Sequence, residues 1–285
     1  MSPAPPVRPS VRVTVGQVST NADPGANRAV VADVLKTAAD AHADLLVLPE
    51  YASAYHPDGV GPELAEPLDG PFVTMLRERA AATGVAVIAG TTAPGSTPTR
   101  AVNTVVAVDG TGSLVGTYRK VHLYDAFGHR ESDRLEAGPA DAPPLVMELH
   151  GMRFGVLTCY DLRFPESARR LVDAGATVLV VPAAWDAGPL KVMHWRTLAT
   201  ARAIENTCAV VAVGQAGGGV IGGSLVIGPD GVVGLEMDER PAVRTVDLDP
   251  TRLGEVRAAD PSLANRRYAV VPRGAGPGVE TQCSE

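Results

Sequence analysis

The segment Phe154-Gly-Val-Leu-Thr-Cys159-Tyr-Asp-Leu-Arg-Phe-Pro165-Glu166 contains an apolar run, a cysteine and a proline in an order that is typical of a strand followed by a turn and a helix. Its apolar beginning predicts a buried β-strand that ends at Cys159, and Pro165 predicts the start of a helix after a short polar turn. Open α/β sheets place ligands and reactive groups at the carboxyl ends of strands, before the next helix. Cys159 is therefore either a nucleophile at such a strand end or a small side chain that fills the core.

Outward from this stretch, strand and helix patterns alternate along the chain. Periodicity predicts strands over residues 11–18, 45–48, 85–89, 177–181, 208–213 and 242–246, and helices over residues 26–43, 72–83, 165–174 and 191–206. Turn sequences predict hairpins that join 103–108 to 114–117, 145–149 to 153–157, and 224–227 to 232–235. The segment after residue 89 is rich in Thr, Pro and Gly and is predicted to be a loop. This order predicts an α/β fold with helices outside one mixed sheet or two sheets, in a single domain over residues 11–270.

Composition excludes several classes of protein. The 285 residues are 45% hydrophobic and 20% charged, which suits a folded domain with a large core. The net charge of −7 argues against nucleic acid and anionic membranes as partners, and no apolar run is long enough to span a bilayer. The proline-rich start predicts a disordered tail over residues 1–10 in place of a signal peptide, and residues 271–285 are predicted to be a flexible tail. We therefore expect a cytoplasmic protein.

Cysteines and lysines are both scarce. The three cysteines have no metal or disulfide spacing; Cys208 is predicted to be buried, and Cys283 lies in the C-terminal tail. Three of the 25 basic residues are lysines (Lys36, Lys120 and Lys191), which leaves 22 arginines. Because the chain uses arginine for most of its basic residues, a lysine indicates a position where the compact charge of an ammonium could be needed. Lys36 is explained without such a need, as a residue on a helix surface.

Three motifs that resemble known sites do not meet their structural requirements. The glycines of residues 217–222 fit G-x-G-x-x-G, but a strand follows them where a dinucleotide site needs a helix. The six histidines, His122, His129 and His194 among them, have no metal-ligand spacing. No G-x-S-x-G sequence supports a serine nucleophile. We predict neither a cofactor nor a metal.

Glu50, Lys120 and Cys159 each follow a predicted strand, where one cleft can collect all three. A free thiol has a pKa near about 8.5, so a general base is needed to form the thiolate at neutral pH. A carboxylate in a dry cleft can take the thiol proton, and a lysine ammonium stabilises both the thiolate and the oxyanion that forms when sulfur attacks a carbonyl. The backbone N–H of Tyr160 is placed to be a second oxyanion donor. Taken singly, each residue also has a structural explanation.

The chain resembles the carbon–nitrogen hydrolase (nitrilase) superfamily, whose hallmark is a Glu–Lys–Cys triad in this order. Three ordered motifs and the segment Arg202-Ala-Ile-Glu205-Asn206 carry the resemblance, over roughly residues 11 to 250. The motifs are Asp44-Leu-Leu-Val-Leu-Pro-Glu50, Tyr118-Arg-Lys120-Val-His-Leu123 and Leu157-Thr-Cys159-Tyr-Asp161-Leu-Arg163-Phe-Pro-Glu166.

The resemblance implies a fold and a set of roles. The fold is a four-layer α-β-β-α sandwich, whose members pair through helices into homodimers or larger assemblies. Cys159 would be the nucleophile, Glu50 the general base and Lys120 the oxyanion stabiliser. Glu131 lies where many members carry a second glutamate of the catalytic site, and Glu136 is the weaker claimant to that role.

Within the superfamily, the motifs are most similar to amidases of small carboxylate-bearing amides, the ω-amidase and deaminated-glutathione amidase branch. The chain departs from that branch at Trp185, which would line the acyl pocket, and in a longer loop before Lys191. Arg163 would either bind a substrate carboxylate or pair with Glu166, and we favour the pairing.

The sequence thus predicts a cysteine-dependent amidase that takes a small-molecule amide through a thioester and releases ammonia. The alternatives are an N-carbamoyl amine hydrolase, a nitrilase, and an inactive partner-binding protein on the same fold.

Overall fold

The computed structural model describes residues 10–273. The predicted tails at residues 1–10 and 271–285 lie outside this range except for residues 10 and 271–273, and Cys283 lies outside it as well. Within the described range, no helix is both long and apolar enough to cross a bilayer.

The strands form two six-stranded sheets. The first sheet has the order β12-β1-β2-β3-β4-β5 and consists of β1 (Val11–Gln17), β2 (Leu45–Val47), β3 (Ala86–Pro94), β4 (Ala101–Val108), β5 (Leu114–Arg119) and β12 (Ala242–Leu248). The second has the order β11-β10-β9-β8-β7-β6 and consists of β6 (Val146–Leu149), β7 (Met152–Val156), β8 (Val178–Ala183), β9 (Ala209–Gly214), β10 (Leu225–Ile227) and β11 (Val233–Glu236). In each sheet, three central parallel strands are flanked by antiparallel ones.

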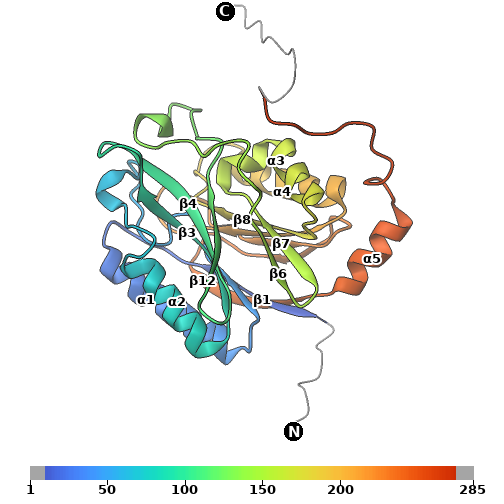
Figure 1. Cartoon of the computed structure of the whole chain (residues 1–285), viewed down its shortest axis with the longest axis horizontal. Coiled ribbons are helices and arrows are strands. Elements are labelled where there is room, and N and C mark those ends of the chain that lie inside the picture. The colour runs from blue at the N-terminus through green and yellow to red at the C-terminus, as the bar shows by residue number, and fades with distance from the viewer. Residues whose placement is uncertain (1–9, 274–285) are drawn as a thin grey trace, which may run out of the picture.

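The helices are α1 (Pro24–Asp40), α2 (Pro71–Thr83), α3 (Pro165–Asp173), α4 (Lys191–Asn206) and α5 (Pro250–Ala259). Two helices cover the outer face of each sheet, α1 and α2 the first and α3 and α4 the second, whereas α5 lies at the side of the molecule (Figure 1). The carboxylate of Asp23 caps α1 by accepting from two backbone N–H groups of its first turn. Gly84 ends α2 in the left-handed conformation, directly after the predicted last residue, 83.

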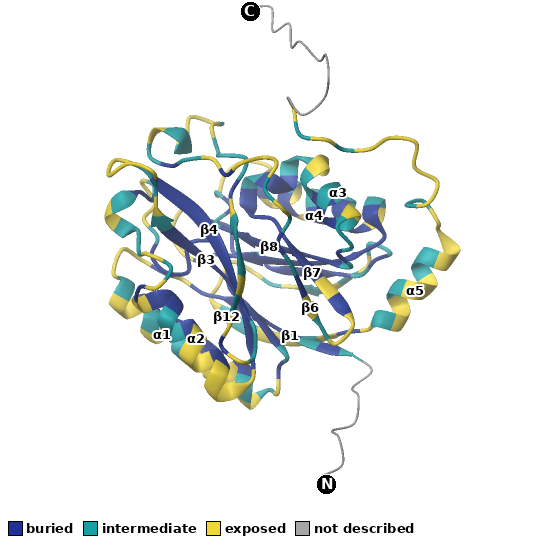
Figure 2. Cartoon of the chain, viewed as in Figure 1, coloured by how far each residue is buried: buried dark blue, intermediate teal, exposed yellow. Residues whose placement is uncertain are grey.

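Three apolar clusters define the layers. One lies between the sheets, one between the first sheet and α1 with α2, and one between the second sheet and α3 with α4. In β2, Leu45 and Val47 face the other sheet, whereas Leu46 faces the helices, so the strand is buried on both sides. Figure 2 shows buried strands between helices whose outer surfaces are exposed. The predicted four-layer α-β-β-α sandwich is confirmed.

The prediction of a loop after residue 89 is wrong, because β3 continues through Gly90-Thr-Thr-Ala-Pro94 and pairs with β4 along that length. Thr91 and Thr92 are buried and β-branched, which suits a strand despite their polarity. Gly90 is needed for a different reason: a Cβ at this position would lie 2.5 Å from Glu50 Cα. The glycine in β3 therefore allows the chain after β2 to pass close to the sheet.

Candidate active site

Glu50, Lys120 and Cys159 meet where strands of the two sheets end. Glu50 follows β2 and Lys120 follows β5 in the first sheet, whereas Cys159 follows β7 in the second. The backbone N–H of Ala184, just after β8 of the second sheet, donates to Glu50 Oε2 at 2.7 Å. One carboxylate of the site is thus anchored across the seam between the sheets.

Lys120 lies between two carboxylates. Its Nζ is 3.0 Å from Glu50 Oε1 and 2.9 Å from both oxygens of Glu131. The side chains of Lys120 and Glu50 are each 1% exposed, so water screens this pair very little. Glu131 also accepts from the backbone N–H of Tyr124 at 2.6 Å, which fixes the loop that covers the site.

Two neutral side chains complete the hydrogen bonding of the carboxylates. Asn103 Nδ2 donates to Glu50 Oε1 at 2.6 Å and to the hydroxyl of Tyr51 at 2.9 Å. The Tyr51 hydroxyl in turn donates to Glu131 Oε1 at 2.9 Å. A continuous network therefore joins both carboxylates to Lys120, and burial strengthens each of its bonds.

A tight turn presents Cys159 at the end of the strand. Its φ of 48° is in the left-handed region, which is uncommon for a side chain other than glycine. Thr158 and Asp161 form a capping box at this turn, and Asp161 Oδ2 accepts from the Thr158 backbone N–H at 3.1 Å. The thiol is buried, and its side chain is hydrogen-bonded to Glu50.

Burial and the neighbouring charges shift the pKa of Lys120 in opposite directions. Burial lowers the pKa of Lys120, but the adjacent carboxylates of Glu131 and Glu50 outweigh it and hold this pKa well above its usual value. For Cys159, burial raises the thiol pKa well above its usual value, Glu50 raises it further, and Lys120 opposes both. The resting site therefore holds an ammonium and a protonated thiol that needs a base before it can attack.

A narrow pocket of about 20 Å³ opens beside the thiol. Its lining residues are Tyr124, Cys159, Tyr160, Arg163, Ala184, Trp185, Asp186 and Lys191. The Arg163 guanidinium lies 4.9 Å from the ring centroid of Trp185. Aromatic faces and two cations therefore form the walls next to the nucleophile, and Tyr160, Arg163 and Trp185 all line this pocket.

The favoured ion pair between Arg163 and Glu166 is not formed. Arg163 turns toward Trp185, and its nearest polar contact is the His194 ring at 3.5 Å. Glu166 lies in the first turn of α3, where a carboxylate is favoured by the helix dipole without an arginine partner. Glu136 lies away from the triad and accepts from Ser96, which leaves Glu131 as the second carboxylate beside Lys120.

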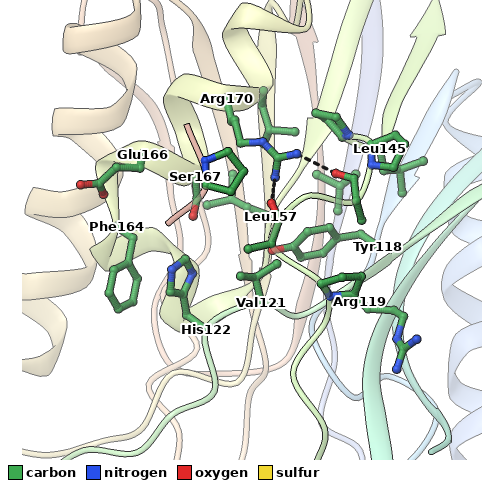
Figure 3. Close-up of a pocket in the computed structure, with 18 of the residues that line it drawn as sticks. Tyr118, Arg119, Val121, His122, Leu145, Leu157, Phe164, Glu166, Ser167 and Arg170 are labelled. Atoms are coloured by element: carbon green, nitrogen blue, oxygen red, sulfur yellow. Dashed lines mark hydrogen bonds between the residues drawn. The ribbon is translucent and has the colours of Figure 1, made fainter. Parts of the chain in front are cut away.

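A larger cavity of about 840 Å³ lies behind the nucleophile turn, and Figure 3 shows it. Tyr118 and His122 on its wall both bond to Asp161 at 2.7 Å, and the His122 ring stacks on Phe164 with centroids 3.7 Å apart. None of the three triad residues lines this cavity. Its wall supports the turn that carries the thiol, but the reactive groups open into the narrow pocket.

No sequence motif indicated Tyr51 or Asn103 as site residues, and Lys191 stood out only as one of three lysines. The sequence does contain a feature that could have indicated Asn103. It is a polar residue inside the apolar run of β4, and a buried amide needs hydrogen-bond partners.

Lys36 lies on the surface as expected, paired with Asp40. Cys208 is fully buried, as predicted. Across residues 10–273, no cluster of three His, Cys, Asp or Glu side chains is arranged to hold a metal ion.

The chain belongs to the carbon-nitrogen hydrolase family, whose model matches residues 12–258. It is 41% identical over 259 residues to deaminated glutathione amidase from Escherichia coli O157:H7, covering 90% of this chain and 97% of that relative. It is 35% identical over 225 residues to 2-oxoglutaramate amidase from Bacillus subtilis strain 168, covering 77% of this chain and 83% of that protein.

A solved structure of an amidase mutant from Nesterenkonia sp. AN1 carries the acetamide moiety of fluoroacetamide on its active-site cysteine. It superposes with a TM-score of 0.75 at 27% identity and covers 90% of this chain and 97% of its own. Together with the site geometry, these relatives establish the present chain as a cysteine-dependent amidase with a Glu–Lys–Cys triad.

Proposed function

We propose that this enzyme hydrolyses the terminal amide of a short acyl chain that carries a carboxylate at its other end. The observation that carries the proposal is Arg163, which lines the pocket of Cys159 with a buried Nε that has no hydrogen-bond partner among the described residues. An arginine fork binds a carboxylate through two parallel hydrogen bonds. The Bacillus subtilis relative takes, by its name, 2-oxoglutaramate, an amide with a carboxylate at its far end.

Acylation begins when Glu50 takes the thiol proton and Cys159 Sγ bonds to the amide carbon. Lys120 Nζ and the backbone N–H of Tyr160 stabilise the oxyanion that forms. Glu50 then passes its proton to the amide nitrogen, the C–N bond breaks, and ammonia leaves a thioester on Cys159.

Deacylation reverses the roles of the same groups. Glu50 takes a proton from water, the hydroxyl oxygen bonds to the thioester carbon, and the C–S bond breaks. The thiolate regains its proton as the carboxylic acid leaves. Glu131 holds Lys120 toward the oxyanion in both steps, because both of its oxygens lie 2.9 Å from Lys120 Nζ.

The partners of the enzyme follow from its surface and charge. Large apolar side chains are exposed at the start and along the outer face of α4, namely Leu190, Val192, Met193 and Ile204. Such a patch supports pairing of two copies into a homodimer or a larger homo-oligomer. The net charge of −7 supports an enzyme of small molecules that binds neither nucleic acid nor anionic membranes, and we place it in the cytoplasm as part of the same proposal.

The test is ammonia release from a panel of ω-amides with a carboxylate, aliphatic amides, N-carbamoyl amines and nitriles. We expect the carboxylate-bearing ω-amides to react fastest, and the Cys159→Ala variant to be inactive while it unfolds at the wild-type temperature. Mass spectrometry of the wild type during turnover should show the acyl group on Cys159. Faster turnover of carbamoyl amines or nitriles would replace the proposed substrate class.

If no compound in the panel reacts, iodoacetamide labelling decides whether the site is inactive. An activated thiol reacts faster in the wild type than in Glu50→Gln. Equal, slow labelling of Cys159 in both would favour a partner-binding protein over an amidase.

A further inference from the structure

Glu50, the base of the proposed reaction, belongs to a closed ring of five hydrogen-bonded side chains. Lys120 Nζ donates to Glu50 Oε1 at 3.0 Å and to Glu131 Oε1 at 2.9 Å. The Tyr51 hydroxyl donates to the same oxygen of Glu131 at 2.9 Å. Asn103 Nδ2 closes the ring, because it donates to the Tyr51 hydroxyl at 2.9 Å and to Glu50 Oε1 at 2.6 Å.

The neutral members of this ring fix the direction of its bonds. Asn103 has two amide N–H groups, and it uses one on Glu50 and one on Tyr51. The Tyr51 hydroxyl accepts from Asn103, so its single hydrogen goes to Glu131. Burial and the nearby charge of Glu131 raise the pKa of Tyr51 well above its usual value, which keeps that hydrogen in place. Toward Glu50, the ring therefore presents two N–H donors and no acceptor.

The two oxygens of Glu50 consequently have different surroundings. Oε1 accepts from Lys120 and Asn103, which occupies both of its lone pairs. Oε2 accepts from the Ala184 backbone N–H at 2.7 Å, which leaves one lone pair. The Cys159 thiol is also hydrogen-bonded to Glu50. A proton that leaves the thiol can be held only on an oxygen whose lone pair is free.

The amide of Asn103 is held in this orientation at a cost. Asn103 is 0% exposed, and its Oδ1 is buried with no hydrogen-bond partner among the described residues. A buried carbonyl oxygen without a donor is unfavourable, and a leucine would avoid that cost inside the apolar run of β4. Turning the amide over would place Oδ1 against the Glu50 carboxylate. The cost therefore points to a role for the amide N–H groups in the site and not in folding.

We propose that Asn103 is a positioning residue that makes Glu50 a base through one oxygen, Oε2. The inference rests on the proposed function, in which Glu50 takes the thiol proton. The S–H bond of Cys159 breaks as the Oε2–H bond forms, and the same proton later bonds to the amide nitrogen as the C–N bond breaks. Asn103 does not line the pocket beside the thiol, so it acts through Glu50.

The test is the pH profile of kcat/KM for Asn103→Leu and Asn103→Asp, measured by ammonia release from the fastest-reacting ω-amide of the panel. Leucine removes the N–H donors at similar volume, and aspartate replaces them by a further carboxylate. Because both changes disfavour the ionised form of Glu50, the acidic limb should move to higher pH, by about one unit in Asn103→Leu and further in Asn103→Asp.

The two kinetic constants should respond differently to Asn103→Leu. At the pH optimum, we expect kcat to fall about 10-fold, because Oε1 is no longer fixed by two donors. KM should stay within about 3-fold of the wild type, because Asn103 does not line the pocket.

The acidic limb can be attributed to position 103 because the other titratable groups around Glu50 are the same in every Asn103 variant. These groups are Lys120, Glu131, Cys159, Tyr51 and Tyr55. Any shift relative to the wild type therefore reports the substitution itself.

Asn206→Leu is the matched control, because it makes the same change at a second asparagine that is 0% exposed. Asn206 Nδ2 donates to the Arg202 backbone carbonyl within α4, outside the ring. We expect Asn206→Leu to lose stability and to keep the acidic limb at its wild-type position.

Urea unfolding checks that each variant is folded at the assay temperature. If neither Asn103 variant is folded, Tyr51→Phe takes their place, because it removes the hydroxyl that holds the amide against Glu50. It should move the acidic limb in the same direction.

An acidic limb that stays in place in the folded variants of the ring would overturn the inference and leave Glu50 as the base. Glu50→Gln tests the function on which the inference rests, since it should remove the acidic limb together with most of the turnover. If Glu50→Gln kept the turnover and pH profile of the wild type, or if the wild type turned over nothing in the panel, the proposed function would be wrong and the inference with it.

Discussion

Lys120 and Lys191 are two buried lysines near Cys159, and their surroundings differ. Lys120 touches Glu50 and Glu131 and has a raised pKa, because the carboxylates outweigh its burial. Lys191 touches aromatic rings and a tyrosine hydroxyl and has a lowered pKa, because burial dominates. Two carboxylates hold the Lys120 ammonium directly, whereas Lys191 has the weaker influence of Asp186 and no direct ion pair among the described residues.

Replacing each lysine by methionine should break this comparison, with the larger effect at position 120. Lys120→Met leaves two carboxylates buried without their cation, so we expect a loss of about 3–5 kcal/mol in the free energy of unfolding. We also expect turnover to fall at least about 10³-fold, since an oxyanion donor is lost. Urea unfolding and ammonia release measure the two effects, with Lys36→Met as the matched surface control. If Lys120→Met were as stable and as active as Lys191→Met, the role assigned to Lys120 would be wrong.

The difference between the lysines also marks what could be predicted from the sequence. Glu50, Lys120 and Cys159 each follow a predicted strand. Their shared location at strand ends could therefore be predicted, because the strands are recognisable from the pattern of apolar residues. The surroundings of Lys191 depend on how the loop at Tyr124 folds over the start of α4, and no periodic pattern reports a contact between such distant segments. The same limit explains why Arg163 was assigned to Glu166, its neighbour in sequence.

Prediction of strands from local composition was limited in a similar way. The run Gly90-Thr-Thr resembles a loop by composition, yet pairing with β4 makes it strand, because a tertiary ladder overrides weak local preference. Helix limits were predicted unevenly: α4 begins and ends at the predicted residues, 191 and 206, whereas the helix predicted over residues 26–43 is α1, Pro24–Asp40, which ends three residues earlier.

Gly90→Ala should sharpen the comparison by disturbing the surroundings of Lys120 alone. The new methyl would lie 2.5 Å from Glu50 Cα and 2.7 Å from the Pro49 carbonyl oxygen, so the backbone that carries Glu50 must shift. We expect kcat to fall about 10²-fold and the free energy of unfolding to fall by about 1–3 kcal/mol.

The matched control for this variant is Gly254→Ala in α5, where a Cβ would meet nothing within 4 Å. It should keep full activity and be slightly more stable, since alanine favours a helix over glycine. A normal kcat in Gly90→Ala would show that the close approach at β3 does not position Glu50.

The smallest expected effect is the pH dependence of stability that Lys191 contributes. In the unfolded chain Lys191 titrates near 10.5; in the folded protein burial lowers its pKa, with Arg163 lowering it further against the opposing effect of Asp186. Between the two pKa values the unfolded state binds more protons, so rising pH favours the folded state. The wild type should therefore gain stability relative to Lys191→Met as the pH rises toward 10.5.

For Lys120 the sign is reversed, because its raised pKa gives stability that is present below 10.5 and is lost as the pH rises through the folded-state value. Urea unfolding of the wild type and Lys191→Met at pH 8 and pH 10 measures the difference. A relative loss for the wild type at the higher pH would mean that a carboxylate neutralises Lys191 as it does Lys120, and the contrast between the two lysines would no longer hold.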